Sequence, residues 1–168
     1  MELAALKRAC EDVQKGYTPN FTVIIVQKRH STRFYAPNPQ MDGVNKGNVP
    51  PGTVVDRYIT NETRNLKEFY LCSHKGMLGT SRPIHCYVIY DDWGLNANDL
   101  EVCTYNLCHL FARAPMAVSL PAPVYYAHLC CYRARRHFAA QRSETNRPDD
   151  KQKMVTVQEK IRNNMYFC

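Results

Sequence analysis

Apolar residues recur at steps of three and four near the N-terminus, and this period predicts an amphipathic helix over residues 2–16. The apolar stripe consists of Leu3, Leu6, Cys10 and Val13. Gly16 is suited to end the helix, because glycine readily adopts the left-handed conformation found after a last helical turn. Thr18, Pro19 and Asn20 follow and indicate a turn into the next element.

The next elements have the composition of strands. Residues 21–26 are almost uniformly apolar and β-branched, a pattern typical of a central strand covered on both faces. Residues 54–59, 68–73 and 84–90 are also rich in β-branched and aromatic side chains, which favours strands. The intervening residues 36–52 are rich in proline, asparagine and glycine and are predicted to be a loop.

Three helices are predicted in the second half of the chain. The first covers residues 97–112, with Asn96 or Asn98 as its N-cap. Its predicted buried stripe consists of Leu100, Cys103, Leu107 and Leu110. Pro121 opens the second helix, because proline fits the first helical turn. A short third helix near residues 155–161 precedes an apolar end.

These elements divide the chain into three predicted parts. Residues 1–140 form one α/β domain, because a run of strands is followed and preceded by helices. Residues 141–153 are polar and charged without a helical or strand period, and are predicted to be a disordered linker. Residues 154–168 form a C-terminal tail that contains the short helix and the apolar end.

The chain is basic, with a formal net charge of +7 and a pI near 9.0. Such a charge favours an anionic partner such as a nucleic acid, although many basic proteins have none. Eight cysteines without any Cys-x-x-Cys pair indicate free thiols rather than a zinc site. No apolar stretch is long enough for a signal sequence or a membrane span. We therefore expect a protein of the cytoplasm or the nucleus with no membrane partner.

The long helix that follows residue 120 carries the most distinctive side chains. At about 100° per residue, Tyr125, His128 and Tyr132 project from one side of it. Arg133 lies about 140° around the helix from His128. His128 is either a core histidine or one that faces a ligand, and Arg133 or Arg136 is either a buried anion clamp or part of a solvated face. One helix can thus present a histidine to one site and a guanidinium to another.

Charged residues also gather at two predicted strand ends. Lys28, Arg29 and His30 follow directly on the first strand, and such a cluster at the end of a buried strand favours an anion nearby. Asp91 and Asp92 end the last strand. They are either ligands of a divalent metal or part of a turn. Neighbouring strand residues point to opposite faces, which favours the turn.

A series of motifs runs through the whole chain in a fixed order. The motifs are Val26-Gln-Lys-Arg-His30, Gly47-Asn-Val-Pro-Pro-Gly-Thr53, Phe69-Tyr-Leu-Cys-Ser-His74, Gly79-Thr-Ser-Arg-Pro83, Tyr105-Asn-Leu-Cys-His109, Ser119-Leu-Pro-Ala-Pro123, Tyr125-Tyr-Ala-His-Leu129 and Arg133-Ala-Arg135. Together with the terminal Met165-Tyr-Phe, they make the chain resemble the C-terminal part of the PIWI domain of Argonaute proteins. The resemblance implies an RNase H-like α/β fold, here its C-terminal portion, with a mixed sheet and flanking helices.

The resemblance also implies a function in RNA silencing. Members of the family hold a small guide RNA, use it to find a complementary target RNA, and act with silencing partner proteins. By resemblance, the positions that contact the guide are Lys28, Arg29, His74, Arg82, Arg113, Ser119, Tyr125 and Arg133. Of these, Arg133 matches an arginine that reaches the adjoining domain, where the 5′ phosphate of the guide is held.

His128 matches the last member of the family's metal-binding catalytic set. In cleaving members, two aspartates and a glutamate complete that set, and they lie upstream of the region represented here. A lone histidine cannot assemble two hard cations. We therefore expect that this chain needs no cofactor and does not cut RNA by itself, and that Mg²⁺ binds only where the site is complete.

Two other functions remain open from the sequence. The chain is either part of a slicing endonuclease whose carboxylates lie in a preceding segment, or a truncated product kept as a protein-interaction surface. Both for a guide-binding piece and for part of an endonuclease, the isolated chain would leave residues 21–26 without neighbouring strands. An uncovered apolar strand promotes association, so we expect the isolated chain to be poorly soluble or partly folded.

Overall fold

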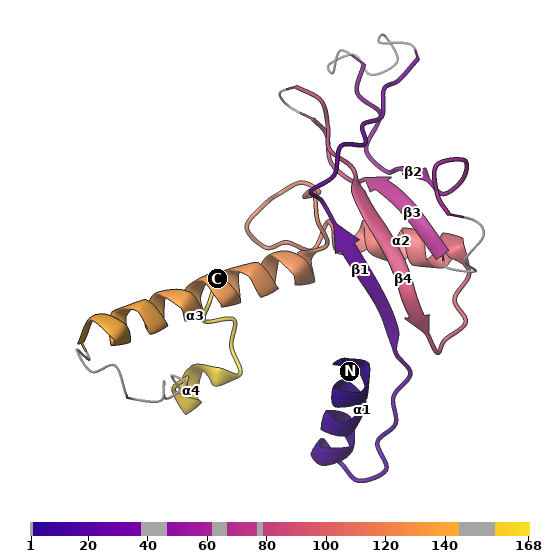
Figure 1. Ribbon diagram of the computed structural model, residues 1–168. Coiled ribbons are helices and arrows are strands. Elements are labelled where there is room, and N and C mark those ends of the chain that lie inside the picture. The colour runs from indigo at the N-terminus through magenta and orange to yellow at the C-terminus, as the bar shows by residue number, and fades with distance from the viewer. Residues whose placement is uncertain (1, 38–46, 62–66, 77–78, 145–156) are drawn as a thin grey trace.

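The computed structural model describes residues 2–37, 47–61, 67–76, 79–144 and 157–168. Within them a four-stranded sheet has the strand order β1-β4-β3-β2 (Figure 1). The strands are β1 (Thr22–Gln27), β2 (Thr53–Val55), β3 (Lys67–Cys72) and β4 (Ile84–Asp91). All three pairings are antiparallel. The α/β class is confirmed. The sequence predicted a mixed sheet, and the strand pairs that the structure describes are all antiparallel.

The N-terminal helix α1 (Glu2–Val13) ends one turn earlier than the predicted boundary at residue 16. Gly16 has a φ of 83°, so it adopts the left-handed conformation that its glycine predicted. No residue of α1 is buried. The apolar stripe of the helix therefore contributes little to the core, and Leu6 and Val13 are exposed.

Strand β1 lies at an edge of the described sheet, not at its centre as the sequence predicted. It pairs with β4 alone among the described strands, and Ile25 is 49% exposed. The uniform apolar composition of β1 was misleading, because composition reports how apolar a strand is and not which strands pair with it. The central position belongs to β4 and β3.

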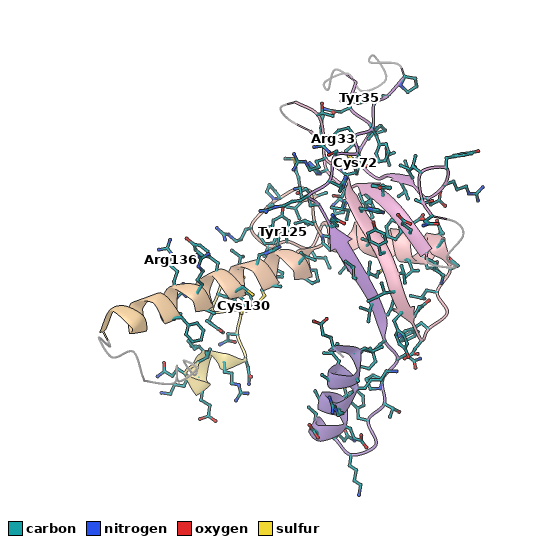
Figure 2. All side chains as sticks on the ribbon, viewed as in Figure 1. Arg33, Tyr35, Cys72, Tyr125, Cys130 and Arg136 are labelled. Atoms are coloured by element: carbon teal, nitrogen blue, oxygen red, sulfur yellow. The ribbon has the colours of Figure 1, made fainter. Side chains whose placement is uncertain are left out.

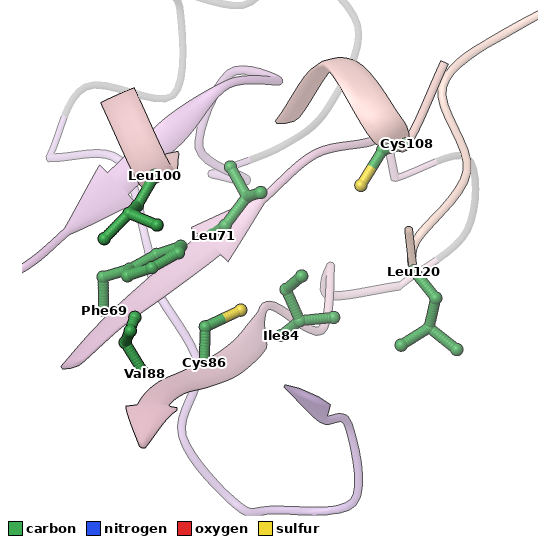
Figure 3. Close-up of a cluster of buried hydrophobic side chains, with 8 residues drawn as sticks. All are labelled: Phe69, Leu71, Ile84, Cys86, Val88, Leu100, Cys108 and Leu120. Atoms are coloured by element: carbon green, nitrogen blue, oxygen red, sulfur yellow. The ribbon is translucent and has the colours of Figure 1, made fainter. Parts of the chain in front are cut away.

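The hydrophobic core lies between one face of the sheet and α2 (Ala97–Leu107) (Figure 3). Alternate residues of the two central strands point into it, as the two-residue period of a strand requires. The core residues are Phe69, Leu71, Ile84, Cys86, Val88, Leu100, Cys108 and Leu120. Leu71, Ile84 and Cys86 are completely buried. This core holds β3, β4 and the segment ahead of the next helix in one rigid unit.

The buried stripe of α2 differs from the predicted one. Leu100 and Thr104 are its buried residues, and Cys108 follows directly after its end. Cys103 and Leu110 are exposed. Thr104 can be buried because its hydroxyl donates to the carbonyl of Leu100 at 2.7 Å. The helix ends five residues before the predicted boundary at residue 112, so Leu110 lies beyond it.

Helix α2 has the predicted cap. Asn96 is the N-cap, and its Oδ1 accepts a hydrogen bond from the backbone N–H of Asp99 at 2.7 Å. This bond satisfies one of the backbone N–H groups left free at a helix start. Asp99 also places a negative charge in the first turn, where it interacts favourably with the helix dipole. Asn98, the alternative cap, is inside the helix.

The third helix α3 (Ala122–Glu144) begins after Pro121 as predicted and extends away from the sheet (Figure 1). It continues past residue 140, so the first residues of the predicted linker are helical. Residues 145–153 of that linker lie outside the described residues. The short helix α4 (Glu159–Arg162) returns beside α3, and the Phe167 ring meets the Tyr126 ring at a centroid distance of 6.4 Å.

The described helices include none that is both long and apolar enough to cross a bilayer. All eight cysteines are free thiols, as the absence of Cys-x-x-Cys pairs predicted. Asp91 is the last residue of β4, and the backbone N–H of Trp93 donates to its Oδ1 at 3.2 Å in the turn that the sequence favoured. Asp91 accepts hydrogen bonds from the Thr22 hydroxyl at 2.9 Å and from Lys67 Nζ at 3.1 Å. Asp92 accepts one from Lys7 Nζ at 3.4 Å.

Candidate nucleic-acid interface

Lys28, directly after β1, is the centre of a hydrogen-bonded cluster. Its Nζ donates to Ser119 Oγ, which is also hydrogen-bonded to Tyr125 OH at 2.9 Å. Ser119 is buried, and Lys28 and Tyr125 are half-buried. The three side chains come from the end of a strand, the loop before α3 and the first turns of α3. Figure 2 shows Tyr125 at the end of α3 that adjoins the sheet.

The loop that carries Ser119 is fixed by its neighbours. The backbone N–H of Val118 donates to the carbonyl of Cys108 at 2.9 Å. The Ser73 hydroxyl donates to the carbonyl of Val118 at 2.7 Å. Ser73 is buried at the end of β3, and Cys108 is buried in the core. The serine is therefore held against two core elements, which places its hydroxyl accurately beside the lysine.

Arg82 adds positive charge near Lys28, and the His74 imidazole lies close to the same lysine. Burial lowers the pKa of Lys28, and the Arg82 guanidinium lowers it further. Burial also lowers the pKa of His74, with Lys28 as the second cause. His74 Nδ1 is buried and has no hydrogen-bond partner among the described residues. Cations that are partly desolvated and face one another are stabilised by a bound anion.

A groove beside this cluster has a volume of about 890 Å³. Four predicted guide or catalytic positions line it, namely Arg29, Arg113, Tyr125 and His128. The other lining residues are Phe111, Leu129, Cys131, Tyr132 and Arg135. The Phe111 and Tyr125 rings are stacked at a centroid distance of 4.9 Å. The lining thus contains cations and aromatic rings, and it contains no carboxylate among the described residues.

His128 lies on the exposed surface of this groove. The alternative of a core histidine is therefore wrong. The described lining of the groove supplies arginines and no carboxylate, so the carboxylates that a two-metal centre requires would have to come from outside the described residues. The described part of the chain contains no group of three or more histidines, cysteines and acids that could hold a metal ion.

Arg133 points into a different groove, as the helix geometry predicted. That groove is lined by residues of α3 and of the C-terminal segment, including His137, Ile161 and Tyr166. Arg133 and Arg136 are both exposed, so the alternative of a buried anion clamp is wrong for this chain. Arg136 lies over the Tyr132 ring, 4.9 Å from its centroid. In Figure 2, Cys130 faces the C-terminal segment and Arg136 faces away from it.

The structure therefore separates the predicted positions into two groups. Those brought together around the Lys28 cluster and the adjoining groove are Lys28, Arg29, His74, Arg82, Arg113, Ser119, Tyr125 and His128. Arg133 stands apart on the other side of α3. Arg135 lines the groove as well and was missed from the sequence. Its position seven residues after His128 was a usable signal, because two helical turns restore the same face.

Comparisons with known proteins place the chain in a family. The family model described as Piwi domain matches residues 1–139. The C-terminal lobe of a budding yeast Argonaute is 32% identical with a TM-score of 0.84, over 100% of this chain and 36% of that one. Kluyveromyces polysporus Argonaute, solved with a guide RNA, is 32% identical with a TM-score of 0.88, over 100% of this chain and 22% of that one.

Drosophila Piwi is more distant, with 28% identity and a TM-score of 0.64 over 77% of this chain and 17% of that one. The chain therefore spans about a third or less of the length of these three solved proteins. These matches confirm the family resemblance that the ordered sequence motifs indicated.

Proposed function

Because the chain belongs to the Piwi domain family, we propose that it forms part of the guide-RNA groove of an Argonaute-type silencing protein. The observation that carries the proposal is the cluster of Lys28, Ser119 and Tyr125 beside a groove lined by arginines and aromatic rings. Its partners are a small guide RNA and the target RNA that pairs with the guide, and in the cell silencing partner proteins.

The chemistry of the cluster suits the backbone of single-stranded RNA. The ammonium group of Lys28 and the imidazole of His74 are offered to a phosphate, and the hydroxyl groups of Ser119 and Tyr125 can exchange hydrogen bonds with phosphate or 2′-hydroxyl oxygens. Arg29 continues the positive surface along the groove. Contacts of this kind recognise the backbone, so binding should depend weakly on base sequence.

Arg113 lines the same groove as the stacked Phe111 and Tyr125 rings and adds a further positive charge to it. Arg133 has a separate role in this proposal, because it points away from the groove. We assign it to the boundary with the adjoining domain, where the 5′ phosphate of the guide is held. Arg133→Ala in a full-length Argonaute should weaken binding of a 5′-phosphorylated guide. Equal affinity of the original protein and Arg133→Ala for this guide would contradict the assignment.

We further propose that the chain does not cleave RNA by itself. His128 faces a groove of cations and rings, and its surroundings lack the carboxylates that two metal ions require. In this setting His128 is a side chain of the RNA groove. Incubation of the 168-residue chain with Mg²⁺ and a guide–target duplex should give no cut product, and metal-dependent cleavage by the pure chain would contradict the proposal.

The binding function is tested with the 168-residue chain and a short single-stranded RNA at a series of salt concentrations. Lys28→Ala should lower the affinity about tenfold, because it removes a charge-assisted hydrogen bond to phosphate. It should also reduce the slope of log K against log salt by about 0.7, the value for one phosphate contact on a single strand.

Arg57→Ala is the matched control, since Arg57 carries the same charge as Lys28 but is exposed in the loop after β2. Its affinity should change little at moderate salt. Equal losses in Lys28→Ala and Arg57→Ala would show that binding follows net charge alone and would overturn the assigned groove.

A further inference from the structure

Asn48 joins two loops that are distant in the sequence. It lies ahead of β2 and is 6% exposed. Its Oδ1 accepts a hydrogen bond from the backbone N–H of Ser81 at 2.9 Å, and its Nδ2 donates to the carbonyl of Gly79 at 2.9 Å. One amide side chain therefore satisfies two backbone groups of the loop between β3 and β4, both in a buried or partly buried setting.

Gly76 shows how closely this loop is packed. A Cβ atom added at Gly76 would collide with Ser81 Oγ and would lie 2.9 Å from Asn48 Nδ2. Gly76 is itself buried. Glycine is required here by a close approach of side chains, since its own φ is not in the left-handed region. The Asn48 amide and the Ser81 hydroxyl thus pack directly against Gly76, and a larger residue there would have to displace them.

The other end of the same segment is held by His30. Its Nε2 lies 3.0 Å from the carbonyl oxygen of Pro83. A carbonyl oxygen only accepts, so Nε2 carries the proton and donates. The residues from Gly79 to Pro83 are therefore fixed on one side by Asn48 and on the other by His30. Arg82 stands between these two attachment points.

Arg82 is the member of this segment that faces the site. It is exposed, and its charge lowers the pKa of Lys28 after the larger effect of burial. Its charge also contributes to lowering the pKa of His30. The two positive charges therefore lie within electrostatic range of each other, and in the proposed site both face the backbone of the same RNA. The position of Arg82 depends on the backbone of its neighbour Ser81, whose N–H is hydrogen-bonded to Asn48.

We propose that Asn48 is a positioning residue of the RNA site, and that it acts through Arg82. This inference rests on the proposed function, because the anion is the RNA phosphate. Asn48 touches no RNA itself. It sets the place of the arginine before RNA binds, so that the loop need not be ordered during binding. Preorganised groups bind more tightly because that ordering cost is already met in the free protein.

A double-mutant cycle tests the inference. RNA affinity and its salt dependence are measured for the 168-residue chain and for Asn48→Ala, Arg82→Ala and the double variant. Each single variant should lower affinity about tenfold and reduce the salt slope by about 0.7. The double variant should bind no more weakly than Arg82→Ala. Asn98→Ala is the matched control, because Asn98 is exposed on α2, and it should bind as the original chain does.

If the fold-losses in RNA affinity of the two single variants multiply in the double variant, the inference is overturned, because Asn48 would then act without Arg82. An unchanged salt slope in Asn48→Ala would also overturn it. Asn48→Asp provides a second case. It keeps the acceptor for the Ser81 N–H, but it buries a carboxylate against the Gly79 carbonyl oxygen, so its affinity should fall at least as far as that of Asn48→Ala.

A second pair of variants tests the clamp without altering Asn48. Gly76→Ala should weaken RNA binding because its Cβ displaces the Ser81 hydroxyl and the Asn48 amide. Adding Ser81→Ala should restore part of the affinity, since it removes the nearest colliding atom. Failure of Ser81→Ala to restore any binding, in a folded double variant, would contradict the packing argument.

Amide hydrogen exchange separates the inference from the proposed function. If the unmodified chain does not bind RNA, the proposed function fails, yet the clamp can still be measured. Asn48→Ala should speed exchange of the Ser81 N–H while the N–H groups of β3 and β4 keep their protection. Unchanged exchange at Ser81 would overturn the clamp itself, whatever the RNA result.

Discussion

His74 is a half-buried histidine in the proposed RNA site, and we expect RNA binding to change its charge. Burial and the nearby Lys28 lower its pKa from the usual value of about 6.5, so it is neutral at pH 7 in the free chain. A bound phosphate favours the charged imidazolium and would raise that pKa. RNA binding is then accompanied by proton uptake, which is a form of thermodynamic linkage.

We therefore expect RNA affinity to increase as the pH falls from about 7.5 to about 5.5, the range around the ordinary histidine pKa. His74→Gln should bind RNA with an affinity that is nearly constant over this range. Fluorescence anisotropy at constant ionic strength gives the measurement. His109→Gln is the control, because His109 is exposed beyond α2, and it should keep the pH dependence of the original chain.

Stability should change in the opposite direction over the same range. The pKa values of His30 and His74 are lowered in the folded chain, chiefly by burial. The unfolded chain therefore binds more protons below about pH 6.5, and the folded state loses stability as the pH falls through that value. Unfolding must be followed alongside affinity. An affinity that falls in parallel with stability, and equally in His74→Gln, would contradict the linkage.

Glu68 and His85 form a contact that sequence patterns do not predict. They form a buried pair with Oε1 and Nε2 2.5 Å apart, and the His85 ring stacks on Tyr70 at a centroid distance of 4.0 Å. These groups lie on the sheet face opposite the hydrophobic core, because they alternate with Phe69 and Cys86. Their sequence neighbours gave no sign of the pair, since it exists only once β3 and β4 are in register.

At the scale of elements, α2 shows where a periodic pattern can mislead. Several apolar residues of this helix were candidates for its buried stripe, and a helix has room for only one such face. The stripe that the fold uses passes through Thr104, a polar residue, because its hydroxyl is satisfied inside the helix. The start of the helix was predictable, since Asn96 caps it by a local interaction.

Two leucine variants distinguish the observed stripe from the predicted one. Leu100 is 1% exposed and Leu110 is 63% exposed. Leu100→Ala should lower the free energy of unfolding by about 3 kcal/mol, because it leaves a cavity in the core. Leu110→Ala should change it by less than about 0.5 kcal/mol. Urea unfolding followed by circular dichroism measures both, and similar losses in the two variants would mean that the predicted stripe was right.

The long helix α3 behaved differently, because its functional geometry is local. The angle between His128 and Arg133 follows from helix periodicity alone, and the two residues do face separate grooves. Periodicity did not predict how deeply each of these two side chains is buried. His128 is exposed and not in a core, and Arg133 is exposed and not buried as a clamp, because depth depends on what packs against the helix.

At the scale of the whole molecule, the sheet is covered by α2 on one face and is partly open on the other. Ile25 and Ile89 are 49% and 50% exposed, and β1 pairs on one side only among the described strands. Apolar side chains beside an unpaired strand edge promote association between chains. This agrees with the sequence-based expectation of poor solubility for the isolated chain, which remains a prediction.

Ile25→Lys should make the isolated chain more soluble and leave its stability nearly unchanged. A charged residue on an edge strand hinders further strand pairing, and a half-exposed position can hold the ammonium group in water. Ile24→Lys is the matched control on the same strand, because Ile24 packs against the core. It should lower the free energy of unfolding by about 2 kcal/mol or more.

Light scattering of the purified chains gives the degree of association, and thermal unfolding gives the stability. Reduced association in Ile25→Lys, with a cooperative transition retained, would confirm that the open face drives association. The same association as in the original chain would show that another surface is responsible.

The sequence by itself determined the type and order of nearly every element, the caps and turns at their ends, and the divergence of His128 and Arg133. These features depend on a few neighbouring residues, whose periodicity and backbone preferences act locally. The ordered motifs also determined the family. Only the tertiary structure decided that β1 is an edge strand and which residues of α2 are buried.

Tertiary structure also decided that Asn48 reaches Ser81 and that Lys28 meets Ser119. The residues of each pair lie more than thirty positions apart. Their contact depends on strand pairing and register, which couple distant segments through packing and long-range hydrogen bonds. A pattern within one segment contains no information about the partner that the fold will bring to it.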